Sequence, residues 1–143
     1  MQIIKFIGFT VFLYVGSIWG KPEKVFAFDP KTVELAGVIE TQTFPGPPNY
    51  ESIKGGDEIE NGWYLKLLEP VTVVADNPQT GLGEETQSNI KILQMAIDYS
   101  KIPEKTLPIG KKVKVKGKLF SRLTGHHHSR VLINVAEVNQ VTE

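Results

Sequence analysis

The sequence contains no cysteine among its 143 residues. This absence excludes a disulfide-stabilised scaffold, a cysteine-ligated zinc site, an iron–sulfur cluster, a thiol nucleophile and a lipid-modified N-terminal cysteine. Common catalytic motifs are missing too: there is no Gly-x-Ser-x-Gly, no His-Glu-x-x-His and no glycine-rich phosphate loop. The length suits one domain, and the missing motifs favour a binding protein over an enzyme.

Excess charge of either sign is also missing. Lysine and arginine total 16, aspartate and glutamate total 16, and the formal net charge is zero. Such a chain has no general field that attracts nucleic acid or an anionic membrane, so neither is an expected partner. One expected strand carries a row of alternating lysines: Lys112, Lys114, Lys116 and Lys118. We interpret this row as a solvated face that discourages pairing between sheet edges.

The N-terminal 27 residues have the pattern of a signal peptide. Lys5 precedes an apolar run over residues 6–15, which is shorter than the ~20 residues that a membrane-spanning helix needs. Gly20 and Ala27 mark two possible cleavage positions. We therefore expect a signal peptide at 1–27, export to the periplasm or out of a bacterial cell, and no stable membrane insertion after cleavage. An uncleaved membrane anchor is the alternative.

Residues 28–143 form one expected domain built of β-strands. Its strand-like segments are rich in β-branched and aromatic residues, and they are bounded by glycine and proline. They cover residues 33–41, 63–68, 89–93, 111–120 and 131–138. Helical spacing occurs only at 93–101, in Leu93, Ala96 and Ile97.

Three strands, an irregular or helical segment and a final hairpin follow the order of the OB fold, a five-stranded β-barrel. The predicted fold class is therefore all-β, a small five-stranded OB-like barrel with one short helical or irregular segment between strands three and four. Gly37 and Gly117 fall where such a barrel coils sharply. On the last two strands, alternation predicts six inward-facing side chains: Val113, Val115, Leu119, Val131, Ile133 and Val135.

Three motifs carry a resemblance to known proteins. They are FPGPPNYESI at 44–53, GKKVKVKGKL at 110–119 and TGHHH at 124–128. The first and third resemble motifs that recur together in a family of small exported bacterial proteins catalogued as a domain of unknown function. The second is similar to the fourth strand of many bacterial OB-like domains. The resemblance covers residues 32–140 and implies no reaction, cofactor or catalytic residue.

Two connections between strands carry the candidate binding site. In an OB barrel, the loop between strands one and two and the loop between strands four and five lie beside one binding face. Here these loops span residues 44–62 and 121–130. The candidate ligand-binding residues within them are Tyr50, Glu51, Asp57, His126, His127 and His128. We therefore expect Tyr50 or Glu51 to contact the histidines.

The three adjacent histidines have two interpretations. On an extended chain His126 and His128 share a face, so they can bind one divalent transition metal. A carboxylate such as Glu51 or Asp57 would then supply a third ligand. Alternatively, the histidines are hydrogen-bonded within a polar turn, because no ligand motif of fixed spacing completes a metal site.

Together these patterns predict an exported, monomeric module that binds an unidentified small ligand or protein at the edge formed by 44–62 and 121–130. Two alternatives remain open at this point. One is a metal-dependent enzyme that uses the histidines. The other is an accessory or inhibitor protein that docks another protein through the proline-rich loop.

Overall fold

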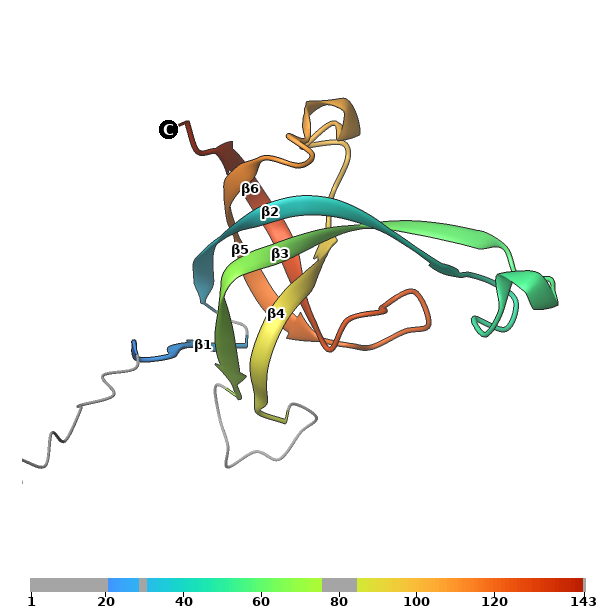
Figure 1. The fold of residues 1–143 in the computed structure, drawn as a ribbon, viewed down its shortest axis with the longest axis horizontal. Helices are drawn as coiled ribbons and strands as arrows, with labels where there is room; N and C mark the ends of the chain where they lie inside the picture. Colours follow the sequence, from blue (N-terminus) through green and yellow to red (C-terminus); the bar gives the residue numbers. More distant parts are fainter. Residues whose placement is uncertain (1–20, 29–30, 76–84, 143) are drawn as a thin grey trace, which may run out of the picture.

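The computed structural model describes residues 21–28, 31–75 and 85–142 (Figure 1). The apolar run of the expected signal peptide lies outside these residues. Within the described part of the chain, no helix has the length and apolar character required to cross a membrane. The described chain is almost entirely β-structure, which confirms the predicted all-β class.

Six strands and two single-turn 3-10 helices make up the described fold. The strands are β1 (Lys24–Ala27), β2 (Thr32–Pro45), β3 (Ile59–Val74), β4 (Gln87–Ala96), β5 (Lys112–Ser121) and β6 (Val131–Gln140). The 3-10 helices are η1 (Ile53–Gly55) and η2 (Glu104–Thr106). η2 lies between β4 and β5, where the sequence predicts the short helical or irregular segment.

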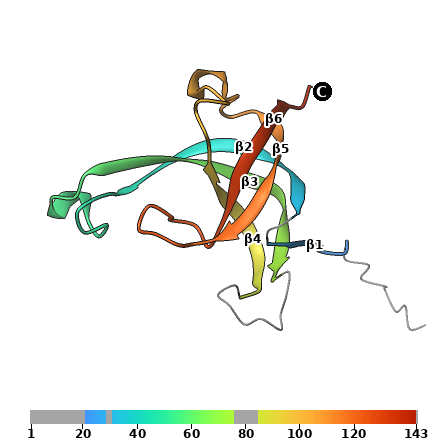
Figure 2. The same cartoon turned by 180° about the vertical axis from the view of Figure 1, so that it is seen from behind.

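Five of the strands close into a ring of hydrogen bonds, seen from opposite sides in Figure 1 and Figure 2. β2 pairs antiparallel with β3 and with β5, β3 pairs antiparallel with β4, and β5 pairs antiparallel with β6. The parallel pair β4–β6 completes the ring. β1 lies outside it and pairs in parallel with the end of β3, along Val71–Val74.

Apolar side chains from alternate strand positions form the core. The six residues of β5 and β6 that were predicted to face inward are all buried in it: Val113, Val115, Leu119, Val131, Ile133 and Val135. On the outer face of β5, Lys114 forms an ion pair with Glu34, and Lys116 forms one with Glu137. The lysine row is therefore flanked by acidic side chains of both neighbouring strands.

Gly117 and Gly37 allow strands to approach each other closely. A Cβ atom at Gly117 would lie 2.3 Å from the carbonyl oxygen of Asn134 and 2.8 Å from Ile133 Cγ1. The β5–β6 register shifts at this position, as it does at a β-bulge. A Cβ atom at Gly37 would lie 2.5 Å from the carbonyl oxygen of Lys66. Glycine is thus required at both positions by contact between backbones.

The helical spacing at 93–101 does not correspond to a helix, because residues 93–96 are strand and the irregular segment begins after them. β4 continues to Ala96, because the backbone of residues 94–96 pairs with residues 132–134 of β6. Leu93 and Met95 alternate into the core as strand residues do. Residues 24–27, which we assigned to the end of the signal peptide, form strand β1 in this structure.

β2 and β3 extend beyond the ring as a two-stranded arm (Figure 1). β5 accompanies β2 only along Thr32–Val38, whereas β2 and β3 stay paired as far as Pro45 and Ile59. We call residues 46–58, which join these strands, the arm tip. We call residues 122–130, between β5 and β6, the histidine loop. Both views show the arm and the histidine loop projecting to the same side of the ring.

Candidate functional site

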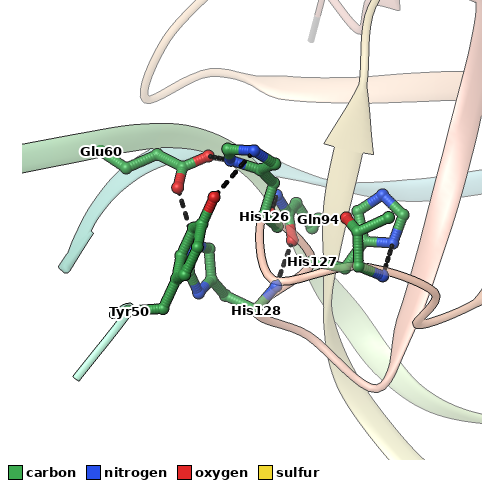
Figure 3. A network of polar contacts seen from close by, with 7 residues as sticks. Tyr50, Glu60, Gln94, His126, His127 and His128 are labelled. Atoms are coloured by element: carbon green, nitrogen blue, oxygen red, sulfur yellow. Dashed lines mark hydrogen bonds and ion pairs between the residues drawn. The ribbon is translucent and has the colours of Figure 1, made fainter. Parts of the chain in front are cut away.

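Polar contacts join the arm to the histidine loop (Figure 3). The Tyr50 Oη atom lies 3.0 Å from His126 Nε2, and the two rings meet edge-on with their centroids 5.2 Å apart. The other ring nitrogen of His126, Nδ1, lies 2.8 Å from Glu60 Oε1. The expected contact between Tyr50 and the histidines is confirmed. His126 therefore connects its loop to both the arm tip and β3.

Asp57 organises the arm tip from within. Its carboxylate accepts hydrogen bonds from the backbone N–H groups of Asn49, Glu51 and Ser52 at 2.8–3.0 Å. The N–H groups of Ser52 and then Glu51 are the main reason that the pKa of Asp57 is lowered from its ordinary value. These bonds fix the chain around Tyr50, whose φ of 59° lies in the left-handed region that few non-glycine residues adopt. Asp57 thus positions Tyr50.

His128 lies against the strands of the arm. Its ring stacks on Phe44 with centroids 4.2 Å apart, and its Nε2 atom lies 3.4 Å from Glu60 Oε2. Gln94 on β4 holds the neighbouring backbone (Figure 3). Its Oε1 accepts from the His128 N–H at 2.7 Å, and its Nε2 donates to the His126 carbonyl oxygen at 2.8 Å. Glu60 and Gln94, which were not predicted as site residues, therefore position two of the histidines.

His127 bonds within its own loop. Its Nδ1 atom accepts hydrogen bonds from the backbone N–H groups of Leu123 and Thr124 at 2.9 and 3.3 Å. Two donors at Nδ1 require a lone pair on that atom, so the neutral ring carries its proton on Nε2. The ring also meets Phe120 edge-on. One of the three histidines therefore has the turn-forming role that we gave as the alternative to metal binding.

The surroundings of His127 favour its neutral form. Burial is the largest cause that lowers the pKa of His127, and the neighbouring basic groups of His126, Arg122 and His128 act in the same direction. The negative charge of Glu60 opposes them. A protonated His127 would also direct an N–H group at two N–H donors. Protonation of His127 at low pH would therefore destabilise the turn of the histidine loop.

We expect the histidine loop to become less stable as the pH falls below about 6.5, the ordinary pKa of histidine. Below that value the unfolded chain takes up a proton that folded His127 does not, so the free energy of unfolding falls until the lower folded pKa is reached. Hydrogen-exchange protection of the Leu123 and Thr124 amides, measured on both sides of this window, tests the expectation. The His127→Phe variant should depend less on pH. Equal pH dependence in both proteins would contradict the assignment.

Within the described residues, no hydrogen bond or ion pair joins the Glu51 or Asp57 carboxylate to a histidine. Both oxygens of Asp57 accept bonds from the arm tip itself, and Glu51 is exposed. Among residues 21–28, 31–75 and 85–142, no group of three or more histidine, aspartate or glutamate side chains is arranged to hold a metal ion. A metal shared by His126 and His128 stays a prediction.

A depression of about 390 Å³ adjoins this network. It is lined by parts of β2, β3, β4 and the end of the histidine loop, including Gln42, Phe44, Tyr64, Lys91, His128 and Arg130. Tyr64 is only 1% exposed, and its hydroxyl has no hydrogen-bond partner within the described chain. Burial, together with the negative charge of Glu60, raises the pKa of Tyr64, so the hydroxyl stays protonated at neutral pH.

A second depression, of about 500 Å³, lies at the N-terminal end of the described chain. Lys21 and Lys24 line it, and both form ion pairs with Glu69, which lines it too. Neither the arm tip nor the histidine loop contributes to it. This depression shares only Asn89 with the first one, and no residue of the histidine network lines it.

A family model described as a domain of unknown function (DUF4431) matches residues 96–139. This stretch runs from the end of β4 through η2, β5 and the histidine loop into β6. No curated protein and no solved structure matches the chain. Over the part that includes the histidine loop, the chain is thus similar to a domain of unknown function, as the resemblance in its general form implied.

Proposed function

We propose that the protein is an exported, monomeric binding module with an OB-like barrel, and that residues 44–62 and 121–130 form its binding edge. The strand order supports the OB-like assignment. Within the ring, the first strand (β2) pairs with the second (β3) and the fourth (β5), and the third (β4) runs parallel to the fifth (β6). In OB barrels, the face of the second and third strands and these two loops bind the ligand.

The depression is the observation that carries the proposal. Its walls come from three strands and one loop that are distant in the sequence, and it combines an aromatic surface with polar groups. Its volume lies at the lower end of the range for small-molecule sites.

Filling the depression tests the proposal. Gln42 lines it from β2, whereas the next residue along the strand, Thr41, points to the opposite face. A library of sugars, sugar acids, phosphate esters and short peptides is titrated into the protein and followed by amide NMR. A binder should shift residues of β4 and the histidine loop, lose binding in Gln42→Trp and keep it in Thr41→Trp. Shifts confined to another surface, or equal losses in both variants, would contradict the proposal.

The same experiment separates the two alternatives. Zinc that shifts His126 and His128, and that no longer does so after both are replaced by alanine, would support a metal site. A peptide that shifts Ile53 and Ile59, the exposed apolar residues at the end of the arm, would support docking of another protein. The small-ligand proposal requires neither result.

We also infer that the leader is removed after Gly20. Cleavage after Ala27 would remove β1 and expose the edge of β3 along Val71–Val74. It would also remove Lys24, which forms an ion pair with Glu69. Mass spectrometry of the exported protein should therefore give an N-terminus at Lys21. An N-terminus at Phe28, or recovery of the full-length chain from the membrane fraction alone, would contradict this inference.

A further inference from the structure

We propose that the depression binds a small anion, a ligand that carries a carboxylate or phosphate group on a compact body, and that Lys91 and Arg130 hold this group. The inference rests on the proposed function and specifies the ligand class of the same site. It follows from the charges, the donors and the apolar surface that line the depression.

The charges that line the depression are all positive. Lys91 on β4 and Arg130 at the end of the histidine loop line it, and no aspartate or glutamate does. The side chain of Lys91 makes no hydrogen bond or ion pair with any residue of the described chain. By contrast, Lys114 and Lys116 on the outer face of β5 both pair with glutamates. The ammonium group of Lys91 is therefore available to a ligand.

Arg130 is held at the rim of the depression by β4. One of its terminal nitrogens is 3.5 Å from Gln87 Oε1, and the other is 3.4 Å from the Ser88 carbonyl oxygen. These contacts are long and leave other N–H donors of the guanidinium group free, since arginine has five. Guanidinium groups bind carboxylate and phosphate oxygens with two parallel hydrogen bonds. Both anion classes therefore suit this position.

The body of the ligand needs an apolar surface, which Phe44 and His128 supply. Their rings are stacked within 3° of parallel, and both line the depression. Glu60 occupies the Nε2 side of the imidazole, which keeps the ring in this orientation. A sugar ring or similar compact group can lie against this pair while its anionic group reaches the two cations.

Three probes that share a glucose-like ring test the inference in the full exported protein at low ionic strength. They are glucuronate, glucose 6-phosphate and glucose, and their binding is followed by amide NMR. We expect at least one of the two anions to bind with shifts at Lys91 and Arg130, at least tenfold more tightly than glucose. The two anionic probes also show whether a carboxylate or a phosphate is preferred. Added salt should weaken this binding, because the cations are exposed.

Matched variants assign the effect to the two cations. Lys91→Gln and Arg130→Gln should each weaken binding of the anion by roughly fivefold or more, because each removes a charge-assisted hydrogen bond. Lys105→Gln, on the distant and exposed η2, should bind as the parent does. Amide spectra and melting temperatures of all three variants should match those of the parent, which shows that they are folded.

Several outcomes would overturn the inference. If glucose binds as tightly as the anions and at the same residues, the anion class is refuted, but the proposed binding function is not. Equal losses in Lys91→Gln and Lys105→Gln would refute the role of Lys91. Anions that shift only residues outside the depression, or that do not bind at all, would refute the ligand class. A different result would refute the proposed function itself, namely that library compounds bind the Gln42→Trp variant as tightly as they bind the parent.

Discussion

Replacement of Val115 by aspartate is expected to remove a large part of the protein's stability. Val115 is completely buried in the centre of the core. Aspartate there would bring a carboxylate among apolar side chains with no cation beside it, which costs about 4 kcal/mol or more. The total stability of a domain this size is about 5–15 kcal/mol. Circular dichroism during urea denaturation should show a transition at far lower urea concentration, or no cooperative transition.

A matched control distinguishes burial from a general effect of aspartate in a strand. Leu68 on β3 is also apolar but is 55% exposed. Leu68→Asp should change the free energy of unfolding by less than about 1 kcal/mol, since exposed substitutions seldom have larger effects. If Val115→Asp denatures at the same urea concentration as the parent, the inward orientation of β5 is wrong.

Replacement of Gly117 by alanine is the other change expected to be severe. The added Cβ would lie 2.3 Å from the Asn134 carbonyl oxygen, and this oxygen belongs to the backbone of the neighbouring strand. β5 and β6 can relieve the overlap only by separating at the bulge, which disturbs the core on both sides. We expect a loss of about 3 kcal/mol and a melting temperature lower by roughly 10 °C or more.

Gly55 offers the matched control for this substitution. A Cβ atom at Gly55 would lie 3.2 Å from the Ser52 Cβ in an exposed turn of the arm tip, where the neighbour can move. Differential scanning calorimetry of Gly55→Ala should therefore show a much smaller decrease in melting temperature. Similar decreases for the two alanine variants would argue against close contact of β5 and β6 at Gly117.

Local patterns predicted the strands well where one face of a strand is apolar and the other is polar. Val113 and Val115 alternate with lysines, and this period of two places them correctly in the core. The pattern failed after Leu93, where apolar residues at helical spacing belong to a strand. The deciding factor was the parallel pairing of β4 with β6, a partner that comes more than 30 residues later in the chain. No local rule contains that information.

The candidate site was predictable in outline and less so in detail. The expected OB order predicted that Tyr50 would lie near the histidines, and the side chains of Tyr50 and His126 are in contact. Glu60 was missed because we began the strand at Trp63 and placed the residues before it in the loop 44–62. Extending the alternation back to Ile59 would have placed Glu60 on the strand. Its contact with His126 joins residues that are 66 positions apart, so only the fold reveals it.

Gln94 is another site residue that the sequence could not reveal. Its side chain bonds to the backbone of the histidine loop, at 32 and 34 positions along the chain. In the sequence it lies within an apolar stretch and carries no motif. An uncharged amide that supports another segment has no pattern of its own, because its role depends entirely on which backbone groups the fold brings within reach.

The order in which the ring closes has a consequence for when the protein can fold. Of the described strands β6 is the last in the sequence, and it pairs with both β4 and β5. Until β6 has been synthesised, those two strands each keep an unpaired edge, and the ring of hydrogen bonds stays open. Long-range pairing of this kind delays folding until the distant segments are both present. The described strands therefore complete their ring only after β6 has been synthesised.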